Sequence, residues 1–177
     1  TDSITDYFFT TSMQANKNLI QEGVEAKKIY FVGNTMIDTL KNNLNKLKCP
    51  KIWDQFNLEK NKYILLTLHR PSNVDDHRYF KNILTEIKYA CANDKIIFPI
   101  HPRSKKQIKL IKHLPKNIHL VSPQSYLEFI YLLKNCKAIL TDSGGVSEEA
   151  TILNIPCLTF RTSTERPETI LEGTNHL

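Results

Sequence analysis

Short apolar runs alternate with helix-like segments from Tyr63 onward, and this alternation limits the folds that the chain can adopt. The strand-like runs are YILLTL (63–68), KIIFPI (95–100), IHLV (118–121), AIL (138–140) and PCLTF (156–160). The helix-like segments are an amphipathic stretch (75–93), a basic helix through Ile111, SYLEFIYLLKN (125–135), a helix at 146–153, and a last turn or helix at RPETILEG (166–173). Strands separated by single helices, without hairpin turns, pair in parallel through right-handed crossovers. The predicted fold class is α/β, with a doubly wound, parallel, Rossmann-like sheet.

The earlier part of the chain adds elements of the same kinds. DYFFT (6–10) and KIYFVGN (28–34) are strand-like, and a helix is predicted from about Ser12 to Glu22, ending at Gly23. A lysine and asparagine bias at 41–62 predicts a loosely held loop. The length of 177 residues is that of one domain of ordinary size.

Composition excludes several classes of protein. A hydrophobic content of 41% with 24% charged residues is typical of a soluble globular protein, and no apolar run is long enough for a transmembrane helix. The segment TDSITDYFF at the N-terminus lacks the regions of a signal peptide, so a cytoplasmic location is expected. The net charge of +6 comes with dispersed lysines and no nucleic-acid-binding motif, which predicts a solvated basic surface and no nucleic-acid or membrane partner.

The four cysteines are far apart and form no CxxC pair. This spacing argues against a zinc site and predicts reduced, mostly buried thiols. No metal site and no redox cofactor are predicted.

Two of the chain's five glycines stand side by side, Gly144 and Gly145, in AILTDSGGVSEEATILNIP (138–156). They fall between a predicted strand and a helix that is expected to begin at Val146. At such a turn a helix presents unpaired N–H groups and the positive end of its dipole, and residues without side chains let an anion approach the backbone. The pair therefore predicts a site for a phosphate or diphosphate.

Polar side chains follow four of the predicted strands. The strand ends read HRPSN (69–73), HPR (101–103), DSGG (142–145) and RTSTER (161–166). A single histidine or arginine in a loop is more often structural or solvated than functional. Ligands in open α/β sheets bind outside the carboxyl ends of the strands, however, so the expected gathering of these residues at one edge favours a binding site.

These motifs, in this order, resemble the UDP-N-acetylglucosamine 2-epimerase family of the non-hydrolysing kind. The resemblance rests on GNTMID (33–38), HR (69–70), TDSGGVSEEA (141–150), TERPE (164–168) and EGT (172–174), and it covers about residues 7–174. It implies that residues 1–177 are a C-terminal UDP-binding domain, one half of a two-domain fold of the glycosyltransferase-B type. The implied N-terminal half would carry the acid and base carboxylates, and the full protein would be a homodimer.

The resemblance also implies roles for residues around the glycine pair. Ser143, Gly144 and Gly145 would bind the diphosphate. Glu149 would hold the ribose hydroxyls, because an ionised carboxylate can accept two hydrogen bonds from a diol. Phe129 would lie against the uracil, although periodicity alone favours a core position for it.

The remaining assignments lie at other strand ends. His69 would reach the phosphate or the sugar, and Arg166 would approach the diphosphate or brace Glu165 and its turn; both are predicted to be catalytic. His101 and Arg103 would add contacts to UDP.

The chain departs from the family pattern at a few positions. The family often has HRREN or HREEN where this chain has HRPSN (69–73), so Pro71 and Ser72 replace charged residues. Ser147 stands where the family has a glutamine before the paired glutamates. These changes keep the expected UDP contacts and leave the identity of the sugar open.

The implied reaction interconverts UDP-N-acetylglucosamine and UDP-N-acetylmannosamine, for the synthesis of surface polysaccharide precursors. UDP departs from the sugar, a 2-acetamidoglucal forms, and UDP adds back after reprotonation on the opposite face. Placed donors such as the glycine turn, His69 and Arg166 would stabilise the leaving diphosphate. The alternatives are a hydrolysing 2-epimerase, an epimerase of a modified UDP-amino sugar, and a nucleotide-sugar-binding module without catalysis.

Overall fold

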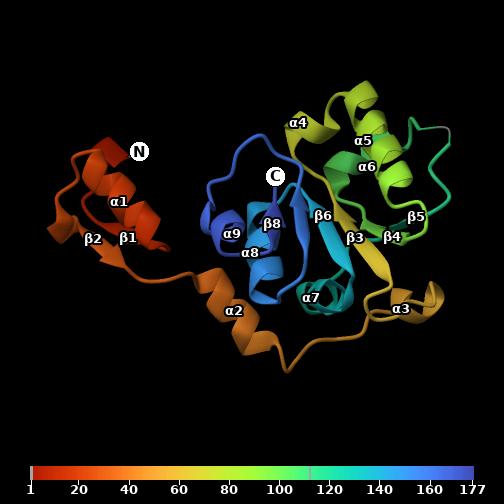
Figure 1. Cartoon of the computed structure of the whole chain (residues 1–177), viewed down its shortest axis with the longest axis horizontal. Helices are drawn as coiled ribbons and strands as arrows, with labels where there is room; N and C mark the ends of the chain where they lie inside the picture. Colours follow the sequence, from red (N-terminus) through yellow and green to blue (C-terminus); the bar gives the residue numbers. More distant parts are fainter. Residues whose placement is uncertain (1, 112) are drawn as a thin grey trace. The chain divides into compact units, whose positions relative to one another are not determined.

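The computed structural model describes residues 2–111 and 113–177, which fall into two compact units (Figure 1). The first unit extends to Asn42 and the second is Asn43–Leu177. Each is considered by itself. The assignment of residues 1–177 to a C-terminal UDP-binding domain stays a prediction.

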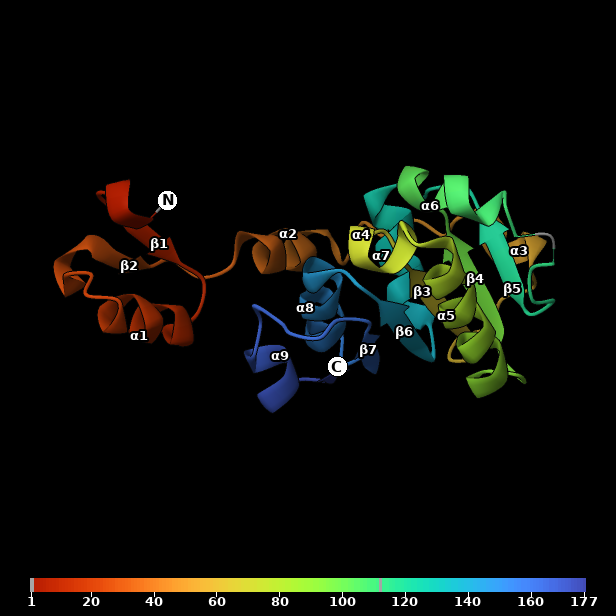
Figure 2. The same cartoon turned by 90° about the horizontal axis from the view of Figure 1, so that it is seen from above.

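The first unit is a strand–helix–strand segment, red to orange in Figure 2. Its elements are η1 (Asp2–Ile4), β1 (Phe8–Thr10), α1 (Met13–Gln21), η2 (Ala26–Lys28) and β2 (Ile29–Phe31), followed by α2 (Thr35–Asn43), which crosses the boundary between the units. The two strands pair in parallel, with Phe8 opposite Ile29. Ser12 caps α1 by accepting a hydrogen bond from the amide of Ala15, and Gly23 follows the helix in a left-handed conformation with φ 89°. The predicted helix with its glycine stop is confirmed.

The second unit is built on a six-stranded sheet in the order β5-β4-β3-β6-β7-β8. Every neighbouring pair in it is parallel. The strands are β3 (Tyr63–Thr67), β4 (Lys95–Pro99), β5 (Ile118–Val121), β6 (Ala138–Thr141), β7 (Cys157–Thr159) and β8 (Asn175–His176). The helices are α3 (Ile52–Gln55), α4 (Pro71–Val74), α5 (His77–Ala90), α6 (Pro102–Ile108), α7 (Tyr126–Asn135), α8 (Gly144–Ile152) and α9 (Glu168–Leu171). This confirms the predicted α/β class and its parallel, Rossmann-like sheet.

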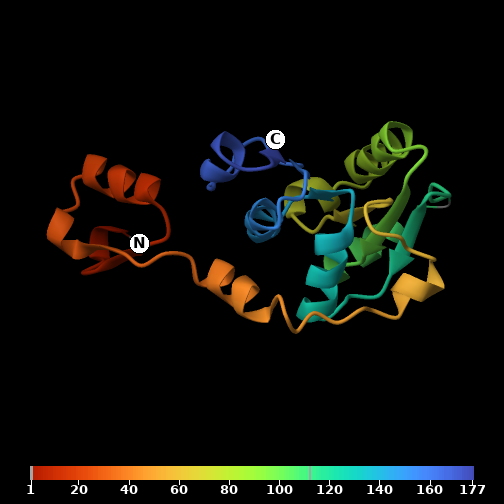
Figure 3. The same cartoon turned by 60° about the horizontal axis from the view of Figure 1, so that its bottom comes forward.

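Helices cover both faces of this sheet. Successive side chains along a strand point to opposite faces, so neighbouring residues of β3 contact helices on different sides. On one face Phe80 and Leu84 of α5 pack into a buried cluster with alternate residues of β3, such as Ile64 and Leu66. On the other face the Tyr63 hydroxyl donates to the carbonyl of Leu132 in α7 at 2.5 Å. The two helices can be followed in Figure 3, α5 in yellow-green and α7 in teal. The sheet is therefore doubly wound, as predicted.

The strand order reverses between β3 and β6, and this reversal fixes where a ligand can bind. From β3 the chain proceeds outward to β4 and β5, and from β6 it proceeds in the opposite direction to β7 and β8. Thr67 and Thr141 lie opposite each other at the carboxyl ends of β3 and β6, with their hydroxyl oxygens 2.7 Å apart. In open α/β sheets the loops that follow such strands diverge, and ligands bind in the crevice at this switch point.

Some elements differ from the sequence prediction. The segment expected to be a loose loop is anchored, since Ile52 and Leu58 are buried and the Trp53 ring meets Tyr131 edge-on at 5.3 Å. Asn57 and Asn61 adopt left-handed turns there, with φ 46° and 61°, so the asparagines that suggested looseness instead make tight turns.

The helix after the glycine pair begins at Gly144 and not at Val146. Ser143 caps it, so the glycines are the first two residues of the helix. Of the cysteines, Cys136 and Cys157 are buried, whereas Cys49 is exposed and Cys91 is half-buried, so burial is less general than predicted. Within residues 2–111 and 113–177, no helix is both long enough and apolar enough to cross a membrane.

Candidate functional site

A cavity of about 210 Å³ lies at the carboxyl ends of β3, β4 and β6. It is lined by Thr67, Leu68, His69, Pro99, Ile100, His101, Pro102, Pro123, Gln124, Phe129, Ser143 and Val146. Four of the residues predicted from the sequence are among these: His69, His101, Phe129 and Ser143. The fold thus brings together side chains from three strand ends and from α7 at the switch point of the sheet.

His69 is held by a buried aspartate. Its Nδ1 lies 2.9 Å from Oδ1 of Asp142, whose side chain is 0% exposed, while the His69 side chain is 38% exposed. A carboxylate on Nδ1 fixes the ring plane and favours the tautomer protonated at that nitrogen. Nε2 is then the nitrogen available to a ligand in the cavity. The rings of His69 and His101 lie next to each other, with centroids 5.3 Å apart.

The Asp142 carboxylate also organises the backbone after β3. It accepts hydrogen bonds from the amides of His69 and Arg70, at 2.9 and 2.8 Å, and from the Asn73 side chain at 3.1 Å. Burial on its own raises the pKa of Asp142, but the hydrogen bonds from the His69 side chain, Arg70 and Asn73 outweigh it and bring the pKa below its ordinary value. The acid is therefore ionised at neutral pH, and it joins the two strand ends of the switch point.

The start of α8 presents its backbone to the same edge. The Ser143 hydroxyl accepts from the amide of Val146 at 3.4 Å. A Cβ placed on Gly144 would lie 3.5 Å from Nη1 of Arg161 and 3.9 Å from Oε1 of Glu165, which are ordinary contact distances. The packing of the chain itself thus does not demand a glycine at this position. Open backbone at a helix start suits the approach of an anion.

Two arginines stand beside this helix start. Nη2 of Arg161 lies 2.5 Å from Oε2 of Glu165, and Nη2 of Arg70 lies 3.5 Å from Oε1. The Arg161 hydrogen bond is the main reason why the pKa of Glu165 is lowered. The Glu165 carboxylate therefore pairs with the two arginines beside Gly144.

Glu149 lies deeper along α8 and is 5% exposed. Its Oε1 accepts a hydrogen bond of 3.1 Å from the hydroxyl of Tyr126, at the start of α7. Burial raises the pKa of Glu149, the Tyr126 hydrogen bond lowers it, and the negative charge of Glu148 raises it; the net shift is upward. Glu149 does not line the cavity of about 210 Å³, but it follows Val146, which does, by three residues on the same helix face.

Arg166 pairs with Glu148. Its Nε lies 2.8 Å from Oε1 of that carboxylate, which is nearly buried. Its contact with Glu165 is a longer hydrogen bond, 3.4 Å, to the backbone oxygen. The structure thus ties Arg166 to α8 and places it outside the residues that line the cavity.

His101 and Arg103 are engaged within the chain. His101 caps α6, and its Nδ1 accepts from the amide of Arg103 at 3.2 Å. Arg103 donates to both carboxylate oxygens of Asp75, at 2.9 and 3.0 Å, on the exposed surface. The hydrogen bond to Asp75 raises the pKa of Arg103. A contact between Arg103 and a ligand would require it to leave this pair.

Sequence reasoning missed two side chains of this edge. The glycine motif DSGG contains Asp142, but its sequence does not indicate that this residue binds His69, 73 positions away. Tyr126 lies in the helix-like segment SYLEFIYLLKN (125–135), whose pattern assigns it no individual role. The pairing of β3 with β6 brings Asp142 to His69, and the fold brings Tyr126 of α7 to Glu149 of α8.

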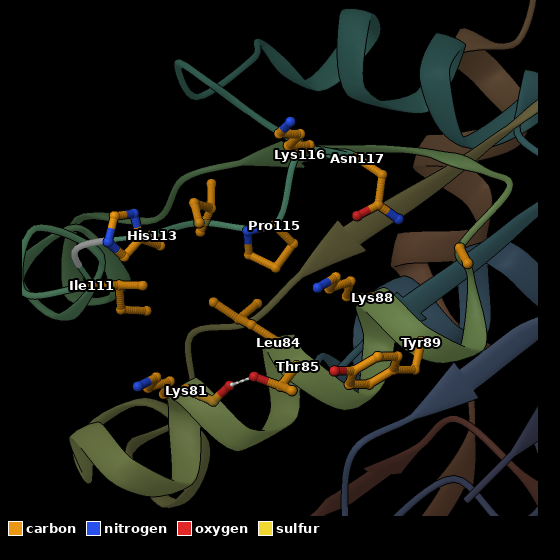
Figure 4. Close-up of a pocket in the computed structure, with 12 residues that line it drawn as sticks. Lys81, Leu84, Thr85, Lys88, Tyr89, Ile111, His113, Pro115, Lys116 and Asn117 are labelled. Atoms are coloured by element: carbon orange, nitrogen blue, oxygen red, sulfur yellow. Dashed lines mark hydrogen bonds between the residues drawn. The ribbon is translucent and has the colours of Figure 1, made fainter.

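A second cavity, of about 560 Å³, lies away from this edge, between α5 and the segment around Pro115 (Figure 4). Lys81, Lys88 and Lys116 contribute to its lining. None of the residues predicted for the site lines it. In the part of the chain that the structure describes, no three histidine, cysteine or carboxylate side chains gather as candidate metal ligands.

Comparison with known proteins identifies the family. The profile of the family described as UDP-N-acetylglucosamine 2-epimerase matches residues 1–177. The UDP-N-acetylglucosamine 2-epimerase of Methanocaldococcus jannaschii is 47% identical over 187 residues, which cover 100% of this chain and 51% of that protein. A UDP-N-acetylglucosamine 2-epimerase homolog of Methanococcus maripaludis is 44% identical over 184 residues, again covering 100% of this chain and 51% of the relative.

Solved structures of UDP-GlcNAc 2-epimerases also resemble this chain. The crystal structure of Methanocaldococcus jannaschii UDP-GlcNAc 2-epimerase in complex with UDP-GlcNAc and UDP matches with a TM-score of 0.85 and 44% identity, over 98% of this chain and 50% of that one. The chain spans about half the length of the curated relatives it matches. Because the family profile covers every residue, the chain belongs to the UDP-N-acetylglucosamine 2-epimerase family.

Proposed function

We propose that this chain is the UDP-binding half of an epimerase that interconverts UDP-N-acetylglucosamine and UDP-N-acetylmannosamine. The observation that carries the proposal is the cavity at the switch point, which is lined by His69, His101 and Ser143 from three strand ends and by Phe129 from α7. Open α/β sheets bind nucleotides at this place. Family membership, with a relative whose structure holds UDP-GlcNAc and UDP, supports the same ligand.

The ligand would lie along the start of α8. The diphosphate would meet Ser143, Gly144 and Gly145, where the amides at the start of α8 and the helix dipole would offset its charge. The uracil would rest on Phe129. The ribose would turn its hydroxyls to Glu149.

The chemistry would begin with departure of UDP from the anomeric carbon. Negative charge then grows on the diphosphate, and a donor fixed beforehand lowers the barrier because it needs no rearrangement. His69 would fit this role as an imidazolium, in which Nδ1–H donates to Asp142, 2.9 Å away, and Nε2–H can donate to the diphosphate. Arg166 would support the charge from its position on Glu148. The elimination and re-addition require no redox cofactor.

The rest of the machinery would lie in another half of a longer protein. That half would complete a glycosyltransferase-B-type fold and supply the carboxylates that move the proton at C2. The full protein would act as a homodimer in the synthesis of surface polysaccharide precursors.

A binding and turnover experiment tests this function. The chain alone is expected to bind UDP weakly and not to epimerise, because the proposed diphosphate site lies in this chain while the proposed acid and base carboxylates lie in the other half. Calorimetry with UDP and an NMR assay for the mannosamine epimer measure both. Epimerisation by the chain alone would contradict the proposal that the acid and base carboxylates belong to another half of the protein.

An assay of the complete protein with UDP-N-acetylglucosamine distinguishes the proposal from two of the alternatives. Turnover to UDP-N-acetylmannosamine supports the proposal, and release of free N-acetylmannosamine would indicate a hydrolysing enzyme. Binding without turnover would indicate a nucleotide-sugar-binding module.

A further inference from the structure

We infer that Tyr126 is a positioning residue for the nucleotide: its hydroxyl holds one oxygen of Glu149 so that the other faces the ribose hydroxyls. This inference rests on the proposed function, because it concerns the same UDP site. It assigns Tyr126 to recognition of the ribose, through Glu149, and not to the chemistry.

The contact joins two helices that both border the switch point. The Tyr126 hydroxyl, at the first residue of α7, donates to Oε1 of Glu149 on α8 at 3.1 Å. Glu149 is 5% exposed, whereas Tyr126 is 40% exposed. A buried carboxylate needs a fixed donor to orient its plane, and the hydroxyl of the half-exposed Tyr126 supplies one.

The position of Tyr126 is itself fixed. Directly before it, Ser125 donates from its amide and its hydroxyl to the Glu128 carboxylate, at 3.0 and 2.6 Å. This closes the first turn of α7. Phe129 stands three residues after Tyr126 on the same helix face and lines the cavity. Tyr126 therefore shares a helix face with the residue proposed for the uracil and contacts the carboxylate proposed for the ribose.

The electrostatics agree with this role. Burial and the charge of Glu148, on the same helix, both raise the pKa of Glu149, and the Tyr126 hydrogen bond opposes them. Glu148 is in turn paired with Arg166 at 2.8 Å. Burial and the nearby Glu149 raise the pKa of Tyr126 to about 12, so the hydroxyl keeps its proton at neutral pH. Tyr126 thus favours the carboxylate form of Glu149, the form that accepts hydrogen bonds from a diol.

The test compares UDP with 2′-deoxy-UDP on the 177-residue chain by calorimetry. The wild type should prefer UDP by about tenfold or more, since a charge-assisted hydrogen bond to the 2′-hydroxyl is lost with the deoxy ligand. Tyr126→Phe should reduce this preference to about threefold or less, and its affinity for inorganic diphosphate should not change. The matched control is Tyr131→Phe on the same helix, whose ring packs against Trp53; it should keep the preference of the wild type.

A double variant makes the test specific to Glu149. In a Glu149→Ala background, Tyr126→Phe should have no further effect on the preference for UDP, because the residue that it positions is gone. An undiminished preference in Tyr126→Phe would overturn the inference while leaving the proposed function intact. A further loss in the Glu149→Ala background would also overturn it. Failure of the wild type to bind either nucleotide would remove the proposed function itself, and this inference with it.

Discussion

At the scale of single residues, Asp142 links the histidine of the site to the sheet. Its carboxylate binds the side chain and amide of His69 and is completely buried. Asp142→Asn should destabilise the chain by about 2–4 kcal/mol at neutral pH, because an amide group would face donors that need an acceptor. Chemical denaturation at several pH values measures this.

The same substitution has a signature in pH. The folded-state pKa of Asp142 is below its ordinary value, so its contribution to stability is present above about pH 4, the ordinary range of aspartate, and is lost as the pH falls further. The difference in the free energy of unfolding between the wild type and Asp142→Asn should therefore become smaller in acid. A constant gap down to the lowest pH at which both proteins fold would contradict the assignment.

Glu149 should show opposite effects on stability and on binding. Its folded-state pKa is raised, so its contribution to stability is full below the ordinary pKa of glutamate and is lost as the pH rises through the folded value. Glu149→Gln removes the buried charge and keeps an oxygen for Tyr126. At neutral pH the melting temperature should rise by about 2–4 °C, equivalent to roughly 1 kcal/mol, while the affinity for UDP falls about tenfold or more.

Calorimetry with UDP and with inorganic diphosphate supplies the control, because only UDP presents a ribose diol. Loss of affinity for both ligands to the same degree, or a lowered melting temperature, would make Glu149 a structural residue.

At the scale of elements, the start of α8 is the part whose sequence is best explained by a ligand. Gly144 has no positive φ, and a Cβ there would meet only ordinary contacts. Gly144→Ala should therefore leave stability unchanged or raise it by up to about 1 kcal/mol, as alanine does in helices, and should weaken UDP by crowding the diphosphate. Binding of uridine, which lacks phosphate, should not change. Equal weakening of both ligands would mean that the helix start does not meet the diphosphate.

The elements also show how far the sequence could predict the structure. Apolar runs with helical segments between them located β3 to β7, because burial on both faces of a parallel sheet leaves continuous apolar sequence. The strand Asn175–His176 is too short for any periodicity, and Pro71–Val74 is a single polar turn of helix. The cluster of His69, His101, Phe129 and Ser143 could be predicted from strand ends and resemblance. The hydrogen bond between Asp142 and His69 could not be predicted, because it depends on the pairing of β3 with β6.

At the scale of the whole molecule, net charge and site act in the same direction. The formal net charge is +6, and a UDP-sugar is an anion, so the general field of the chain favours its approach. The general field acts over the whole surface of the chain, whereas the proposed site is confined to one edge of the sheet. Added salt should therefore slow the association of UDP, whereas substitutions at the start of α8 should lower its affinity.

A titration of the isotope-labelled chain with UDP, followed through its backbone amide NMR signals, tests whether the switch point is the nucleotide site. The amides of His69, Gly144 and Gly145 should shift first and furthest, because they lie where the diphosphate is proposed to bind. The amides around the cavity of α5 and Pro115 should stay in place. Shifts confined to that second cavity, or no shifts at a saturating excess of UDP, would contradict the assignment of this edge of the sheet to UDP.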